Sequence, residues 1–188
     1  MMNAVIETML KRRSVRKYED RPVARELLEE IVKCGQYAAT AIGLQPWHFT
    51  VVTDRGMLDR ISAANAVIME QDPNLPPMLR ADIEAGNYDS FRGAPCTVLL
   101  AGENGKVFAD VDCAIAVDNM ALAAESLGLN TCILASFKPS LMGEAGSAMR
   151  AELGIPEGYT PNLALAIGYG AETPEAKPRR EGCVNWVE

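Results

Sequence analysis

The sequence predicts an α+β fold in which helices pack on a mostly antiparallel or mixed sheet of four to five strands. Four short apolar runs have the composition of strands, and helical patterns separate them at irregular intervals. The connections are too uneven for a doubly wound parallel sheet. The chain has 188 residues, of which 48% are hydrophobic, so we expect a single domain over residues 1–188 with a substantial core.

The charge balance excludes several classes of partner. The formal net charge is −7 and the sequence pI is about 4.9, so the surface repels nucleic acid and anionic membranes wherever basic residues are not gathered. The first residues contain no apolar signal segment, and no run approaches the roughly 18 apolar residues of a spanning helix. We therefore expect a cytoplasmic protein without nucleic acid or membrane partners.

Cysteine usage agrees with a reducing compartment. The five cysteines are an odd number and contain no C-x-x-C spacing, which argues against both a disulfide framework and a zinc site. They are Cys34, Cys96, Cys113, Cys132 and Cys183.

The first half of the chain predicts two helices and a strand. Apolar residues at helical spacing predict a helix over about 2–10, which ends in a basic turn at 11–13. The pattern resumes over about 27–38, although the usual polar N-cap is missing. A stretch of small residues over 38–44 then leads into a β-branched and aromatic run at 47–52, which predicts a strand.

The middle of the chain predicts two further helices and a second strand. Helical spacing covers about 55–69, and three prolines within 71–77 end it and begin a loop or lid. A short helix over about 78–84 and a loop over 86–93 precede an apolar strand at 97–101. Gly102 to Gly105 predict a turn.

The most strongly specified helix covers 110–127 and is apolar nearly all round, with Gly128 placed to end it. A monomer of this size cannot cover a helix on every side, so we expect a subunit interface on it. A strand over 131–135, a helix over 140–153 and a last strand over 162–168 follow. The remaining tail, 172–180, is rich in proline.

Near the N-terminus, Arg12-Arg13-Ser14-Val15-Arg16 places three guanidiniums and a hydroxyl within five residues. Planar guanidiniums and a hydroxyl suit the oxygens of a phosphate, which predicts an anion site. The alternative is that Lys11, Arg12 and Arg13 only complement the C-terminal dipole of the first helix. That alternative does not account for Arg16, which lies beyond the last turn.

The sequence offers no catalytic constellation of its own. His48 is the only histidine and lies between aromatic residues at the start of a strand, where a packed histidine is much commoner than a catalytic one. No His or Cys spacing fits a metal site. Gly102 to Lys106 and Gly168-Tyr169-Gly170 lack the spacing of phosphate-binding and dinucleotide-binding loops.

The neighbouring carboxylates Glu29-Glu30 and Asp110 with Asp112 fit solvated helix faces or N-terminal turns. A chain with arginines for an anion but no nucleophile and base suits a bound cofactor that carries the chemistry.

Four separated segments define the family resemblance. They are Arg12-Arg13-Ser14-Val15-Arg16-Lys17-Tyr18, Gln45-Pro46-Trp47-His48-Phe49, Asp112 to Leu129 followed by Thr131-Cys132, and Ala166-Ile167-Gly168-Tyr169 followed by Lys177-Pro178-Arg179. In this order and spacing they resemble a short member of the FMN-dependent nitroreductase family over nearly the whole chain. The resemblance implies an α+β intertwined homodimer that holds two FMN molecules between its subunits. The family's long buried helix corresponds to 110–127.

The resemblance also implies roles for individual residues. Arg12, Arg13 and Ser14 hold the phosphate and ribityl end of FMN, joined by Lys177 and Arg179 from the tail. The resemblance places Arg16 toward the pyrimidine edge of the flavin ring. It implies that Ala39, Thr40, Ala41 and Gln45 of the facing subunit line the ring and the ribityl chain. It implies that Leu134, Ala135 and Ser136 cover the opposite side of the ring.

Two departures concern the ring more than the phosphate. Relatives commonly carry Pro-Ser and an Asn before Gln-Pro-Trp, where this chain has Ala39-Thr40 and Gly43, so Gly43 offers only its backbone. The turn after Cys132 lacks a glycine that is frequent in relatives. FMN binding is therefore a firmer expectation than any substrate.

The resemblance implies an enzyme in which NADH or NADPH reduces the flavin and a small electron acceptor, such as a nitroaromatic or a quinone, then reoxidises it. Other flavin chemistries on the same fold stay open, namely dehalogenation, flavin fragmentation and dehydrogenation of a peptide-derived ring. So do a non-catalytic flavin-binding or sensor protein and a partner-binding domain with a basic corner. The loop region 71–93 covers the site in this interpretation and decides the substrate.

Overall fold

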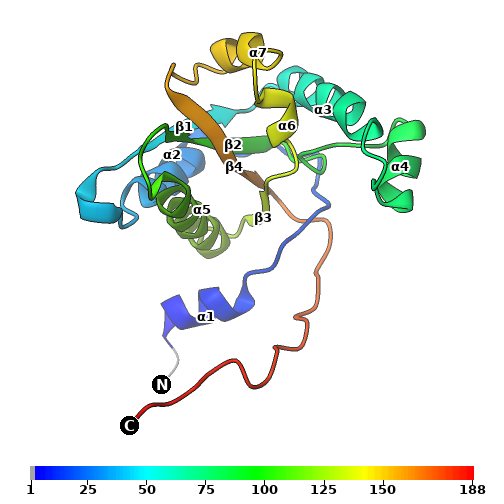
Figure 1. The fold of residues 1–188 in the computed structure, drawn as a ribbon. Coiled ribbons are helices and arrows are strands. Elements are labelled where there is room, and N and C mark those ends of the chain that lie inside the picture. Colours follow the sequence, from blue (N-terminus) through cyan, green and yellow to red (C-terminus); the bar gives the residue numbers. More distant parts are fainter. Residues whose placement is uncertain (1–2) are drawn as a thin grey trace.

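The computed structural model describes residues 3–188, and Figure 1 shows helices on both faces of a central sheet. The sheet has four strands in the order β1-β2-β4-β3, and every neighbouring pair is antiparallel. The strands are β1 (Trp47–Val52), β2 (Cys96–Glu103), β3 (Asn130–Leu134) and β4 (Tyr159–Gly168). The predicted α+β fold is confirmed.

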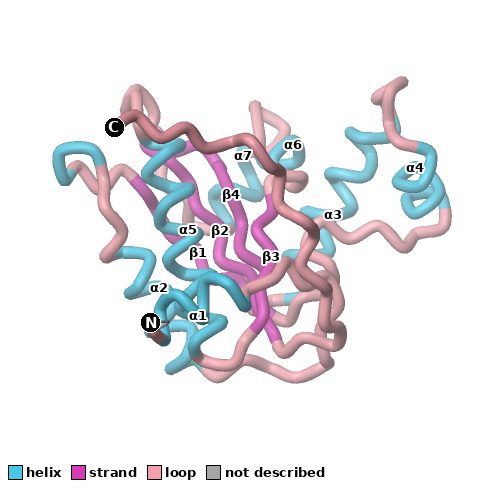
Figure 2. Tube along the Cα trace, turned by 90° about the horizontal axis from the view of Figure 1, so that it is seen from below, coloured by secondary structure: helices cyan, strands magenta, loops and turns pink. Residues whose placement is uncertain are grey.

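Two layers of helices enclose the sheet. Figure 2 shows α1, α2 and α5 in front of the strands, whereas α3, α6 and α7 cover the other face in Figure 1. The helices are α1 (Ala4–Lys11), α2 (Arg25–Gln36), α3 (Arg55–Glu70), α4 (Pro77–Glu84), α5 (Ala109–Ser126), α6 (Lys138–Leu141) and α7 (Ser147–Glu152), with a short 3-10 turn η1 (Ala41–Gly43) before β1. No helix among residues 3–188 is long and apolar enough to cross a membrane.

Alternation along the central strands divides the core between the two faces. On β2, Val98 and Leu100 pack with α2 and α5, whereas Leu99 and Ala101 pack with α3 and α6. α5 is the most buried helix, and Met120 at its centre is fully enclosed. The sequence pattern of 110–127 correctly identified this helix.

α5 ends as the sequence predicts. Gly128 has φ +78°, its N–H donates to Glu125 at 3.1 Å, and the N–H of Leu129 donates to Ala124 at 2.9 Å. These two bonds form a Schellman motif, which requires a left-handed residue at the Gly128 position.

We expect Gly128→Ala to lower the free energy of unfolding by about 1–2 kcal/mol, because a Cβ is strained in the left-handed region. Gly128→Asn should lose less, since asparagine tolerates this conformation better. Urea denaturation of both variants measures the difference. An alanine variant as stable as the parent would contradict the argument.

The helix predicted over 140–153 is wrong, because the chain forms two short helices, α6 and α7, in its place. Gly143 between them has φ +62°, and a Cβ on Gly146 would lie 2.5 Å from the backbone carbon of Leu141. The chain therefore folds back on itself. Arg150 bridges the turn, since its Nη1 donates to the carbonyls of Leu141 and Gly143 at 2.6 and 2.8 Å.

The turn predicted over 102–105 begins too early. Gly102 still belongs to β2, where it pairs with Trp47 and Thr160. A Cβ at this position would lie 3.1 Å from the Cβ of Ala109. This glycine allows α5 to approach the strand closely and is not a turn residue.

The outward sides of α1 and α5 expose apolar residues. Val111 and Ile115 on α5 are 53% and 39% exposed, and Val5, Met9 and Leu10 on α1 are each more than half exposed. The predicted subunit interface on 110–127 falls on this surface. It stays a prediction, because the structure contains one chain.

Candidate functional site

The segment that carries the arginine run lies along the β3 edge of the sheet. Ser14 forms a parallel bridge with Thr131, and the N–H of Val15 donates to the Thr131 carbonyl at 3.0 Å. Val15 is only 2% exposed and fixes the segment in the core. Further along, Tyr18 pairs with Gly170 beyond the end of β4. The predicted anion site therefore lies at a sheet edge and not at the end of a free helix.

The three predicted guanidiniums differ in what they contact. Nη1 of Arg12 is buried and has no hydrogen-bond partner within residues 3–188. Nη1 of Arg13 already donates to the carbonyls of Leu10 and Arg12, each at 2.7 Å. Arg16 is exposed, and its Nη1 donates to the Ser14 carbonyl at 3.2 Å. Arg12 thus offers the clearest open donor for a phosphate oxygen.

Lys11, in the last turn of α1, pairs with a carboxylate of another helix. Its Nζ lies 3.3 Å from the carboxylate of Glu125, whose side chain is 6% exposed. This ion pair joins α1 to α5 and leaves Lys11 engaged away from the arginine run.

Cys132 of β3 is subject to charges from several parts of the chain. Burial raises the pKa of the Cys132 thiol, the charges of Arg16, Arg92 and Arg12 act against that rise, and the charge of Glu172 adds to it. Arg92 was not predicted, because it belongs to no motif. It is a non-glycine residue with φ +62° in an exposed turn, a conformation that is uncommon outside functional or tightly held turns.

The residues predicted to cover the ring follow directly after β3. Leu134 is buried, whereas Ala135 and Ser136 are exposed. Within the described chain, the N–H groups of Ala135 and Ser136 have no hydrogen-bond partner. Two open backbone donors therefore lie on the same edge as the guanidiniums, and this donor set suits a phosphorylated ligand with a polar ring.

The predicted residues before β1 lie elsewhere in the same chain. Thr40 and Gln45 hold one another, since the N–H of Gln45 donates to Thr40 Oγ1 at 3.2 Å. Ala39 is exposed, and the N–H of Ala41 donates to Asp112 at 3.1 Å. This loop leads into β1, which is the edge of the sheet opposite β3. A single chain does not bring it to the arginine run, so its predicted role depends on a second copy.

Asp112 differs from the sequence prediction. It lies in the first turn of α5, as expected, but it is only 3% exposed and is not solvated. One carboxylate oxygen accepts from the N–H of Ala41, and the other is buried without a partner in the described chain. The loop before β1 covers Asp112, and only tertiary structure could show this.

The tail residues predicted for the phosphate lie on an exposed segment after β4. Lys177 and Arg179 are exposed, and Arg179 Nη1 donates to the Lys177 carbonyl at 2.9 Å. In Figure 1 the tail runs on from the end of β4 as an extended segment.

A well-defined cavity lies away from this site. It has a volume of about 1040 Å³ and lies against α2 and the loop that leads into it. None of the predicted cofactor residues lines it. The arginine edge is the stronger candidate site, because the open donors lie there. A site shared by two copies leaves only a partial hollow in one chain.

His48, the single histidine of the sequence, is half-buried in β1. The ring of His48 packs edge-on against Tyr159, with 6.1 Å between their centroids. In the described part of the chain, no group of His, Cys, Asp and Glu side chains could hold a metal ion. The five cysteines are all free.

Comparison with known proteins gives one consistent family. The model of the nitroreductase family matches residues 9–169. A protein of Methanothermobacter thermautotrophicus, provisionally named an NADH dehydrogenase or NAD(P)H nitroreductase, is 31% identical over 175 residues, which cover 90% of this chain and 79% of that protein. The FMN reductase (NADPH) of Bacillus subtilis is 27% identical over 180 residues, 95% of this chain and 70% of its own length.

A solved structure extends the likeness to three dimensions. The crystal structure of a nitroreductase with bound FMN from Bacteroides fragilis superimposes with a TM-score of 0.91. It is 28% identical in sequence, and the superposition covers 100% of both chains.

Proposed function

Because this chain belongs to the nitroreductase family, we propose that it is an NAD(P)H-dependent FMN oxidoreductase that reduces a small electron acceptor such as a nitroaromatic or a quinone. The observation that carries the proposal is the β3 edge, where the unpartnered Nη1 of Arg12 lies on the same edge as the open N–H groups of Ala135 and Ser136. The named relatives and the FMN-bound neighbour support the choice of cofactor.

The chain's own residues position and stabilise the cofactor. We assign Arg12, Arg13 and Ser14 to the phosphate end, with Lys177 and Arg179 completing the charge when the tail closes on it. When bound, FMN supplies the redox chemistry by taking a hydride from NADH or NADPH and passing electrons to the acceptor. The absence of an acid–base constellation fits this division.

Arg16 has a separate role in the proposal. It is exposed at the same edge, and its backbone N–H donates to the carboxylate of Glu172 at 2.6 Å, which fixes the chain there. We assign its guanidinium to the pyrimidine side of the ring, where positive charge stabilises the negative charge that accumulates on reduction.

A homodimer completes the site in this proposal. The loop of Thr40, Ala41 and Gln45 lies at the opposite sheet edge, so it can line the ring only from a second copy. The exposed apolar residues of α1 and α5 offer the surface for that contact. We place this dimer in the cytoplasm, where five unpaired thiols remain reduced.

The decisive experiment is anaerobic mixing of the FMN-loaded protein with NADH or NADPH. We expect the flavin absorbance to bleach within a catalytic time scale, and to return when a nitroaromatic or a quinone is added. A protein that takes up no FMN would contradict the proposal. A protein that binds FMN but stays yellow with both nucleotides is a flavin binder or sensor.

A protein with another flavin chemistry on the same fold would lose its flavin absorbance with NAD(P)H but would not regain it with these acceptors. Halogenated substrates should then be tried for dehalogenation, and the reaction products should be tested for fragments of the flavin. The segment 71–93, which contains α4, is where we expect this choice to be encoded.

A further inference from the structure

Asn65 is a fully buried polar residue that none of the site assignments explains. It lies on α3 with 0% exposure, beneath two loops that come from distant parts of the chain. Its Nδ2 is 2.7 Å from the carbonyl oxygen of Ser136 and 2.6 Å from the hydroxyl of Tyr88. Two longer contacts, to Ser90 Oγ and Met69 Sδ, are 3.4 Å each. One side chain therefore joins α3 to both loops.

The orientation of this amide follows from its partners. A backbone carbonyl can only accept, so the nitrogen of Asn65 must face Ser136. Its two N–H groups match the two short contacts, to Ser136 and Tyr88. The oxygen Oδ1 is buried with no partner among residues 3–188, so its burial is unfavourable. The two hydrogen bonds that the amide donates are therefore the interactions that hold it in place.

The bond to Ser136 fixes a very short segment from both ends. Leu134 is still paired with Ala164 in the sheet, and Ser136, only two residues later, is held by Asn65. The N–H groups of Ala135 and Ser136 lie within this segment and are the open donors of the candidate site. Asn65 therefore sets where these donors point without reaching the ligand itself.

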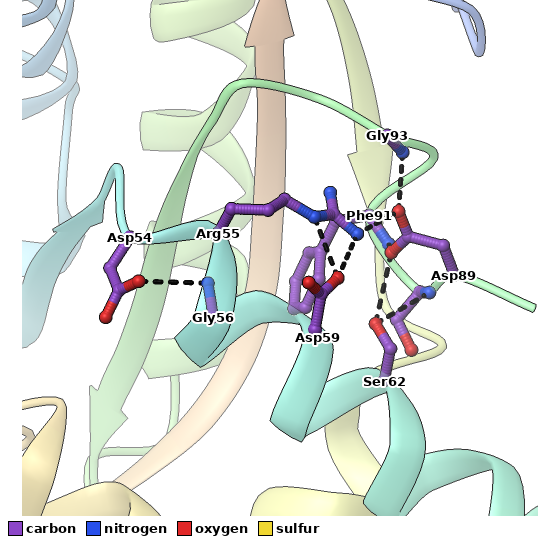
Figure 3. Close-up of polar contacts among 9 residues, drawn as sticks. Asp54, Arg55, Gly56, Asp59, Ser62, Asp89, Phe91 and Gly93 are labelled. Carbon is purple, nitrogen blue, oxygen red and sulfur yellow. Dashed lines mark hydrogen bonds and ion pairs between the residues drawn. The ribbon is translucent and has the colours of Figure 1, made fainter.

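A second network on the same helix holds the neighbouring loop, and it meets the contacts of Asn65 at Ser90. Ser62, one turn before Asn65, donates to Asp89 at 3.1 Å and accepts from the N–H of Ser90 at 3.1 Å. Asp89, on the right of Figure 3, also accepts from Arg55 at 2.6 Å and from two backbone N–H groups, those of Phe91 and Gly93. This network holds the turn over 89–93 on α3 and does not involve Ser136.

We propose that Asn65 is a positioning residue, which holds the Ala135–Ser136 donors against the isoalloxazine ring of FMN by binding the Ser136 carbonyl. The inference rests on the proposed function. Through Tyr88, the same amide ties these donors to the loop region that we expect to select the acceptor. Asn65 touches neither flavin nor acceptor and acts only through these partners.

Two variants of Asn65 and one control test the inference. Asn65→Leu removes both donated bonds at similar size, and Asn65→Asp keeps the shape but turns lone pairs toward the Ser136 carbonyl. Arg60→Ala is the matched control, because it removes an exposed ion pair between α3 and Glu152 and leaves the hydrogen bonds of Asn65 in place. For each apoprotein, fluorescence titration gives the Kd for FMN and for riboflavin, and urea denaturation gives the stability.

We expect both Asn65 variants to bind FMN about tenfold more weakly, which corresponds to about 1.4 kcal/mol. Riboflavin affinity should fall by a similar factor, because the ring is common to both ligands. The visible absorption band and the midpoint potential of bound flavin should shift as well. Arg60→Ala should keep both affinities, the spectrum and the potential. If Asn65→Leu does not fold, Asn65→Asp alone gives the test.

Two results would overturn the inference. One is an unchanged Kd, spectrum and potential in the Asn65 variants. The other is an equal change in Arg60→Ala, which would assign the effect to a general perturbation of α3. The proposed function fails independently, since it is judged on the parent protein before any variant is made. If the parent binds FMN and NAD(P)H bleaches it, but the Asn65 variants show no change in Kd, spectrum or potential, only this inference fails.

Discussion

Replacing Arg12 with alanine is expected to weaken FMN binding about ten- to a hundredfold, while riboflavin binding stays at the parental level. A hydrogen bond from a charged group contributes roughly 1.5–3 kcal/mol, and this range corresponds to those factors. Arg12 is the best candidate because its buried Nη1 lacks a partner in the described chain, whereas Nη1 of Arg13 is already engaged by two carbonyls. Riboflavin lacks the phosphate, so it isolates this contact from contacts to the ring.

Fluorescence titration of the apoprotein with the two ligands measures the effect. Arg60→Ala is a suitable control, because that guanidinium forms an exposed pair with Glu152, at 2.8 and 2.9 Å, between α3 and α7. It should leave both affinities unchanged. An Arg12 variant that loses riboflavin as strongly as FMN would show that the residue supports the fold of the segment and does not bind the phosphate.

The second large effect concerns Asp89. We expect Asp89→Asn to lower the free energy of unfolding by about 2–4 kcal/mol at pH 7. The carboxylate accepts from Ser62, Phe91, Gly93 and Arg55, and its side chain is 19% exposed. An amide cannot accept from all four groups, and the charge of Arg55 would lose a buried partner. Urea denaturation at pH 7 gives the difference between parent and variant.

The pH dependence of this difference has a definite sign. Burial by itself raises the pKa of Asp89, but the hydrogen bonds from Phe91, Arg55 and Gly93 outweigh it and hold the pKa below its ordinary value. A lowered pKa contributes stability that is present above the unfolded value, about 3.9, and lost as pH falls through the folded value. The difference in the free energy of unfolding between the parent and Asp89→Asn should therefore narrow as pH falls from about 5 toward 3. A difference of constant size over that range would contradict this assignment.

Much of the fold followed from local patterns. The strand over 47–52 was placed at its observed bounds, because six β-branched and aromatic residues leave little choice of conformation. The long helix and its end at Gly128 were likewise encoded locally. The helix over 140–153 was wrong because its apolar spacing persists through Gly143 and Gly146, and only the left-handed turn and the contact with Leu141 reveal the break.

By itself, the sequence determined the family, the α+β class and the arginine run, since these depend on residue types at close spacing along the chain. Only the tertiary structure decided which guanidinium is open, and it buried Asp112 under the loop before β1. It also connected Asn65 to Ser136 across 71 positions of sequence. These facts depend on which distant segments pack together, and a buried hydrogen bond between such segments leaves no periodic trace in the sequence.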